Sequence, residues 1–194
     1  MSSSAQSAIH RLSSAGVSAA LGILVLVTAG PLRAQTTAAA AEPAAPPLTF
    51  DLKDQFDRGV TQAVCTGRIA IVVVADREGS RFSGRWSQAL GSGLKSAGAP
   101  ATKWVGVATL PSLPGFMRGF VKGKFSQDKE QGTLLDWGGT LAQAYHLAPK
   151  CCHILVFGPD GRLRHHASGR EVDPAAIAGV VAAVSAAGSG GRQR

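Results

Sequence analysis

The chain holds three cysteines, and two of them, Cys151 and Cys152, are neighbours in the sequence. A thiol exchanges disulfides or reduces peroxide as its thiolate, so a cysteine whose surroundings lower its pKa is a candidate catalytic residue. Cys151 and Cys152 are therefore the candidates for an atypical thiol–disulfide oxidoreductase or a peroxide-handling antioxidant protein. They could also close a strained vicinal disulfide that acts as a redox switch or a rigid binding surface. The alternative is two reduced cysteines packed on opposite faces of a strand.

Two histidines could join one of these cysteines in a metal site. His153 and His166 lie in two strand-like segments separated by the turn sequence Gly-Pro-Asp-Gly at residues 158–161. A two-residue turn would place His153 opposite His166, with Cys151 on the same face of the hairpin. One thiolate and two imidazoles suit copper or zinc. The alternative is that His153 packs inside its strand and His166 is exposed on an edge strand.

The acidic candidates for catalysis are few. Asp76 and Glu78 follow an apolar run and stand beside Arg77 and Arg81, so they read as an ion-paired surface turn or, alternatively, as catalytic carboxylates. Asp136 ends an apolar segment before two glycines, which predicts that it caps a turn. No serine–histidine–aspartate triad, phosphate-binding glycine loop or carboxylate pair has usable spacing.

The hydrophobic pattern predicts the elements that must position these residues. Residues 69–74 are a continuous apolar run, which is typical of a strand buried on both faces. Residues 81–97 carry large apolar side chains at every fourth position and predict an amphipathic helix. Asp173 and Pro174 predict the start of the last helix. Further strands are predicted at residues 48–52, 103–110, 133–136, 153–157 and 163–167, and further helices from Pro114 and over residues 141–147.

Strands and helices alternate until an antiparallel hairpin is followed by a helix, which indicates a mixed sheet in a three-layer α/β/α fold. The local motifs are Phe-Asp-Leu-Lys-Asp-Gln at residues 50–55, Gly67-Arg68, Leu-Leu-Asp-Trp at residues 134–137 followed by Ala142 and Tyr145, and Phe-Gly-Pro-Asp-Gly-Arg at residues 157–162. In order and spacing they resemble the thioredoxin superfamily, and within it the exported thioredoxin-like reductases and the peroxiredoxins. The resemblance covers the whole segment 48–187 and implies a thioredoxin-like fold for it.

The resemblance also implies where the redox cysteines and the cis-proline of that family would stand. The cysteines would fall between Asp76 and Phe82, and this window holds none. The cis-proline position, before the hairpin strand, falls at Cys151 or Cys152, and Pro149 comes two or three residues early. The chain departs from the family at both places, so no catalytic residue is carried over from it.

The thioredoxin-like arrangement also bears on disulfide pairing. Cys65 precedes the first core strand, while Cys151 and Cys152 begin a hairpin strand that would run antiparallel to it. The beginnings of two such strands lie at opposite edges of the sheet, about 16 Å apart. A disulfide needs Cα atoms within about 7 Å. We therefore predict that Cys65 stays a buried or partly buried free thiol.

The N-terminal composition predicts export. Residues 1–34 read as a signal peptide, because the apolar stretch at 17–29 is shorter than the roughly 20 residues that span a bilayer. An uncleaved membrane anchor is the alternative. Residues 35–47 form an Ala/Pro-rich linker, residues 48–187 the domain, and residues 188–194 a Gly/Ser/Arg tail expected to be disordered. The expected location is the periplasm or the extracellular space, with no stable transmembrane segment after cleavage.

The chain is basic, with 20 Lys and Arg against 12 Asp and Glu and a formal net charge of +8. This excess favours weak attraction to anionic surfaces. Export argues against nucleic acid as a partner. The leading hypothesis is an exported, redox-inactive thioredoxin-like domain without a cofactor, which holds a protein or peptide partner and uses whichever of Trp86, Trp104 and Trp137 is exposed.

Overall fold

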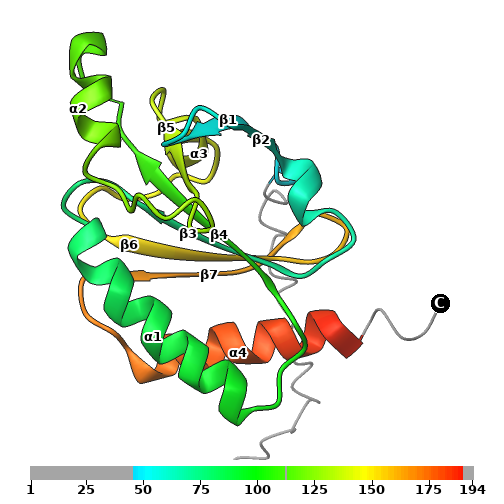
Figure 1. The fold of residues 1–194 in the computed structure, drawn as a ribbon. Coiled ribbons are helices and arrows are strands. Elements are labelled where there is room, and N and C mark those ends of the chain that lie inside the picture. The colour runs from blue at the N-terminus through cyan, green and yellow to red at the C-terminus, as the bar shows by residue number, and fades with distance from the viewer. Residues whose placement is uncertain (1–45, 112, 190–194) are drawn as a thin grey trace, which may run out of the picture. The chain divides into compact units, whose positions relative to one another are not determined.

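A computed structural model describes residues 46–111 and 113–189. The predicted signal peptide, nearly all of the predicted linker and the last five residues of the predicted tail lie outside these ranges. The described strands form one seven-stranded sheet in the order β2-β1-β5-β4-β3-β6-β7 (Figure 1). The strands are β1 (Asp51–Asp54), β2 (Gly59–Thr61), β3 (Ala70–Ala75), β4 (Lys103–Thr109), β5 (Thr133–Asp136), β6 (Cys152–Phe157) and β7 (Leu163–Gly169). The helices are η1 (Gln62–Cys65), α1 (Ser80–Ser96), η2 (Gly115–Met117), α2 (Arg118–Lys122), α3 (Thr140–Ala144) and α4 (Pro174–Ser189).

The central strand, β3, explains the continuous apolar run of the sequence. It pairs in parallel with β4 on one side and antiparallel with β6 on the other. Both of its faces are covered, and Ile71 and Val72 are fully buried although they point to opposite sides. A strand buried on both faces has no position for a polar side chain, as the sequence predicts. The sheet as a whole is mixed, in agreement with the predicted fold class.

Two separate cores lie on the two faces of the sheet. On one face, α1 and α4 lie side by side across the strands (Figure 1), and Trp86, Leu90 and Val180 pack beneath them. On the other face, α3 and η1 cover a core that contains Leu141 and Phe157. These are the three predicted layers.

The two predicted capping residues, Asp173 at the last helix and Asp136 at a turn, are confirmed by their hydrogen bonds. The Asp173 carboxylate accepts a hydrogen bond from the Ala175 backbone N–H at 2.9 Å, and Pro174 occupies the first position of α4. Asp136 is fully buried and accepts from the backbone N–H groups of Thr140 at 3.0 Å and Leu141 at 2.9 Å. Both carboxylates satisfy amides that have no partner within their helix. Asp136 is thereby accounted for as a structural residue.

Several boundaries differ from the prediction because of short-range geometry. The strand predicted at residues 48–52 is β1 at 51–54, and its partner β2 was not predicted, since three residues carry no readable alternation. The helix predicted from Pro114 is a single 3₁₀ turn followed by the five-residue α2, which Gly123 ends. The last helix runs through Ser189, two residues into the segment predicted as a tail.

The hairpin of β6 and β7 has a different register from the predicted one. His153 lies opposite Ser168, and Leu155 lies opposite His166. Two irregularities cause the shift: Gly161, with φ of +72°, lengthens the turn by one residue, and a bulge near Phe157 adds another. Because side chains alternate between the two faces of a sheet, a shift of two residues leaves each side chain on its predicted face. His153 and His166 therefore still share a face, as diagonal neighbours.

Candidate functional site

The candidate site lies at the edge of the sheet where β3, β4 and β5 end and β6 begins. Ala75, the last residue of β3, pairs with Cys152, the first residue of β6, so the turn leading into α1 faces the loop that precedes β6. The fold therefore brings the window expected to hold redox cysteines next to Cys151 and Cys152, as the sequence predicts for a thioredoxin-like domain.

A single carboxylate ties the two sides of this edge together. Oδ1 of Asp76 accepts a hydrogen bond from the Gly79 backbone N–H at 2.7 Å, and Oδ2 accepts one from the Lys150 backbone N–H at 2.7 Å. The Lys150 ammonium is also 3.8 Å from Glu78, in a pair that is exposed on both sides. Arg77 and Arg81 were expected from the sequence to pair with these two carboxylates, and this was wrong. Lys150, 74 positions after Asp76, takes their place through its backbone N–H and its ammonium group.

The same two segments touch at Gly79. A Cβ atom at this position would lie 2.0 Å from the Cys151 carbonyl oxygen and 2.6 Å from its carbon. The φ of Gly79 is −61°, which any residue could adopt, so glycine is needed here for space and not for backbone freedom. The start of α1 and the loop before β6 are thus in direct backbone contact.

The first turn of α1 carries serines at the spacing of a Cys-x-x-Cys pair. Ser80 is the first residue of α1 and donates a hydrogen bond to the Arg77 carbonyl oxygen at 2.8 Å. Ser83 follows one turn later, and its hydroxyl opposes the rise in the pKa of the Cys152 thiol that burial causes. This serine pair was not among the site residues predicted from the sequence. Its signal was available in the i, i+3 spacing of two hydroxyls directly after the buried strand.

The three cysteines are free thiols in three different environments. Cys152 is fully buried, and burial raises the pKa of its thiol, an effect that the Ser83 hydroxyl reduces and the neighbouring Cys151 increases. Cys65 lies in the core on the other face of the sheet, where burial raises the pKa of its thiol and the charge of Lys103 partly offsets the rise. Cys151 is half-buried. Cys65 is thus the buried free thiol that was predicted, and a raised pKa opposes thiolate formation at both buried cysteines.

The predicted histidine pair does meet. Nε2 of His153 is 2.7 Å from the Ala148 carbonyl oxygen, which can only accept, so Nε2 carries the proton. Nδ1 of neutral His153 then accepts a hydrogen bond from Nε2 of His166 at 3.0 Å. Loss of hydration lowers the pKa of His166, and the nearby His153 and His165 lower it further. The pair therefore anchors the loop that begins at Ala148.

A complete metal-ligand set is not assembled in the part of the chain that the structure describes. No group of three or more His, Cys, Asp or Glu side chains there is placed to hold a metal ion. Of the candidate ligands Cys151, His153 and His166, the two histidines are hydrogen-bonded to each other. Copper or zinc binding stays a prediction.

The three tryptophans differ in their access to solvent. Trp86 points from α1 into the core and is fully buried, so it does not meet the condition of exposure and is excluded as a partner contact. Trp104 is 37% exposed but stands near the start of β4, at the edge of the sheet opposite the candidate site. Trp137 directly follows β5 at the site edge and is partly exposed, with the Arg118 guanidinium 5.1 Å above its ring. Trp137 is the tryptophan positioned at the site.

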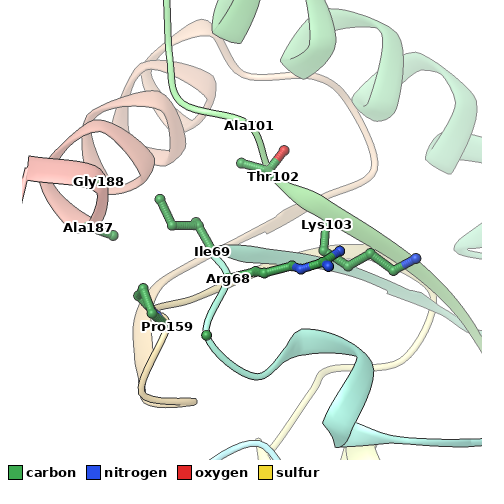
Figure 2. Close-up of a pocket in the computed structure, with 9 residues that line it drawn as sticks. Arg68, Ile69, Ala101, Thr102, Lys103, Pro159, Ala187 and Gly188 are labelled. Atoms are coloured by element: carbon green, nitrogen blue, oxygen red, sulfur yellow. The ribbon is translucent and has the colours of Figure 1, made fainter. Parts of the chain in front are cut away.

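A cavity of about 450 Å³ lies at the opposite edge, where β3 and β4 begin. It is bounded by the end of α4 and by the hairpin turn at Pro159, and its charged lining residues are Arg68 and Lys103 (Figure 2). Their side chains extend away from Pro159 and Ala187. This cavity and the candidate thiols are therefore at different ends of the sheet.

Comparison with solved structures establishes the fold. BsSco, a member of the Sco family of cytochrome c oxidase assembly proteins with an identified disulfide switch, gives a TM-score of 0.51 at 13% identity, over 75% of this chain and 98% of its own. A thiol:disulfide interchange protein, DsbE, from Chlorobium tepidum gives 0.50 at 16% identity, over 75% and 97%.

The chain thus has a thioredoxin-like fold, as the sequence motifs predict. No protein-family model matches the sequence, and no curated protein matches it. Among the described helices, none is both long and apolar enough to cross a bilayer.

Proposed function

We propose that this chain is an exported thioredoxin-like domain that binds a protein or peptide partner and does not exchange disulfides through the first turn of α1. The observation that carries the proposal is the serine pair, Ser80 and Ser83, in the turn where a redox protein of this fold needs a thiolate. A hydroxyl in the same place can donate and accept hydrogen bonds but does not form a mixed disulfide.

The neighbouring thiol does not compensate for the missing one. Cys152 is buried, and its raised pKa favours the protonated form, which is a poor nucleophile. Asp76 and the contact at Gly79 hold the two sides of the site against each other. Such a rigid edge suits a surface that recognises a partner without rearranging, because a preorganised surface loses less entropy on binding. Trp137 with Arg118 provides an aromatic and cationic contact at that edge.

The proposal is tested by catalysis of insulin reduction in dithiothreitol. The native chain should not accelerate the reaction above the uncatalysed rate. The matched variant Ser80→Cys/Ser83→Cys places two thiols at the start of α1 and should acquire measurable activity, which verifies that the scaffold and the assay work. Catalysis by the native chain that disappears in Cys151→Ser or Cys152→Ser would overturn the proposal.

One observation favours an atypical thiol–disulfide or peroxide-handling enzyme as the second candidate. Cys151 is half-buried, so its thiol has some access to solvent, and its backbone touches the start of α1 at Gly79. Alkylation and intact mass of the chain, purified after export and without reductant, separate the two candidates. Three alkylated thiols and no added metal support the binding domain. One alkylated thiol with a two-hydrogen mass deficit supports a disulfide among the three cysteines.

A further inference from the structure

The segment at residues 115–125, which we name the basic aromatic tip, exposes two large apolar side chains. Phe116 is 87% exposed and Phe120 is 64% exposed, more than any other large hydrophobic residue in the part of the chain that the structure describes. Two neighbouring phenyl rings left in water are unfavourable for a free protein, and such patches mark interaction surfaces.

The same segment is cationic. It contains Arg118, Lys122 and Lys124, and residues 113–127 contain no acidic side chain. The Lys124 ammonium lies 4.7 Å from the centre of the Phe120 ring. Lys122 forms an ion pair with Asp57, so one of the three charges is locally compensated. Lys124 therefore lies against one exposed ring, and Arg118, whose guanidinium lies over Trp137, belongs to the same segment. Basic and aromatic side chains combine in this way in protein segments that lie in the interface of a bilayer.

The position of the basic aromatic tip in the fold indicates what kind of partner it binds. In Figure 1, α2 projects beyond the ends of the strands, on the side of the sheet edge where β4 ends and away from α4, and η2 directly precedes it in the sequence. A projecting tip can place its rings between the headgroups and the acyl chains of a bilayer, because the lipids rearrange around the inserted side chains. A folded protein would need a hollow that matches both rings.

We infer that the basic aromatic tip docks on an anionic phospholipid bilayer, with Phe116 and Phe120 entering the interface and Arg118 and Lys124 meeting lipid phosphates. The charge is complementary locally and overall, since residues 35–194 contain 18 Lys and Arg against 12 Asp and Glu, a formal +6. Two rings and a few cations give weak, reversible attachment and not insertion across the bilayer. This inference is independent of whether the cysteines are redox-active.

The test is co-sedimentation with vesicles of phosphatidylglycerol and phosphatidylcholine, compared with phosphatidylcholine alone. The chain is purified after export, so that any processing of its N-terminus has already occurred. We expect binding to the anionic vesicles that weakens as salt is added. Phe116→Ser/Phe120→Ser should reduce the partition coefficient by about tenfold or more, because each phenyl ring loses its apolar contact.

Matched variants separate the tip from general surface effects. Val64→Ser/Trp104→Ser removes two less exposed hydrophobic residues elsewhere and should leave binding nearly unchanged. Arg118→Gln/Lys124→Gln should weaken binding several-fold, whereas Arg162→Gln/Arg164→Gln removes the same charge from the β6–β7 hairpin and should weaken it less. Equal binding to both vesicle types, or an unchanged coefficient in the phenylalanine variant, would overturn the inference. Absence of vesicle binding at low salt would also overturn it, leaving a protein as the occupant of the tip.

Discussion

The two edges of the sheet are built differently, although the same strands form both. At the edge where β3 ends, the turn into α1 and the loop before β6 are in contact, joined by Asp76 and by the close approach at Gly79. At the edge where β3 begins, the loops leave a cavity of about 450 Å³ beside Arg68 and Lys103. The cavity therefore lies at the opposite end of the sheet from Cys151, Cys152, the serine pair and the anchored loop.

The contact at Gly79 makes this end of the sheet the more sensitive to substitution. Gly79→Ala should lower the free energy of unfolding by about 3 kcal/mol, because the new Cβ would force the start of α1 away from the Cys151 carbonyl. Gly84→Ala is the control in the same helix, where a Cβ meets nothing within 4 Å. It should stabilise the protein by about 0.5–1 kcal/mol. Urea denaturation of both variants checks the prediction, and equal effects would contradict it.

Removal of the Asp76 carboxylate is the next largest change. Asp76→Ala should lower the free energy of unfolding by about 2 kcal/mol, because the amides of Gly79 and Lys150 lose a charged acceptor. Glu78→Ala removes only an exposed ion pair and should change stability by less than about 0.5 kcal/mol. Hydrogen exchange of the two amides gives a local readout, and unchanged protection in Asp76→Ala would refute the role of this carboxylate.

The histidine pair predicts a smaller, pH-dependent effect at the same edge. The pKa of His166 is lowered from its usual 6.5 in the folded protein by loss of hydration and by His153 and His165. The unfolded chain then binds the proton more readily, so this contribution to stability is present above about pH 6.5 and is lost as the pH falls. His166→Gln should lose less stability than the native chain between pH 7.5 and 5 in chemical denaturation.

Ser168→Ala is the matched control for the histidine experiment. It changes the residue opposite His153 in the register but keeps both imidazoles. Its pH dependence should follow that of the native chain. If the stability of His166→Gln changes with pH in the same way as that of the native chain, the histidine pair is not the source of the pH dependence.

The smallest effect is expected at the cavity edge. Ala101 lines the cavity, so Ala101→Leu can place its larger side chain in open space. Its free energy of unfolding should change by less than about 1 kcal/mol, in contrast to the single methyl group added at Gly79. Thermal unfolding of the two variants side by side measures the difference between the edges. A large destabilisation by Ala101→Leu would mean that both edges are equally tight.

The sequence by itself determined the elements whose signals are local. The strand at residues 133–136 has the predicted bounds, and the caps at Asp136 and Asp173 act as predicted, because a cap is formed within a few residues of the chain. The buried β3 followed from its uninterrupted apolar run. The absence of a cysteine from the first turn of α1 was likewise readable, since the turn follows that strand directly.

Only the tertiary structure decided the contacts between distant segments. Asp76 bonds to Lys150, which no local pattern connects to it, and Trp86 is buried because α4 covers the same face as α1. The register of His153 depends on one extra residue in the turn and one in the bulge, and neither has a signal in the hydrophobic alternation. The exposure of Phe116 and Phe120 could not be predicted from the hydrophobic pattern either. An apolar side chain predicts burial, and only the path of the chain between β4 and β5 leaves these two in solvent.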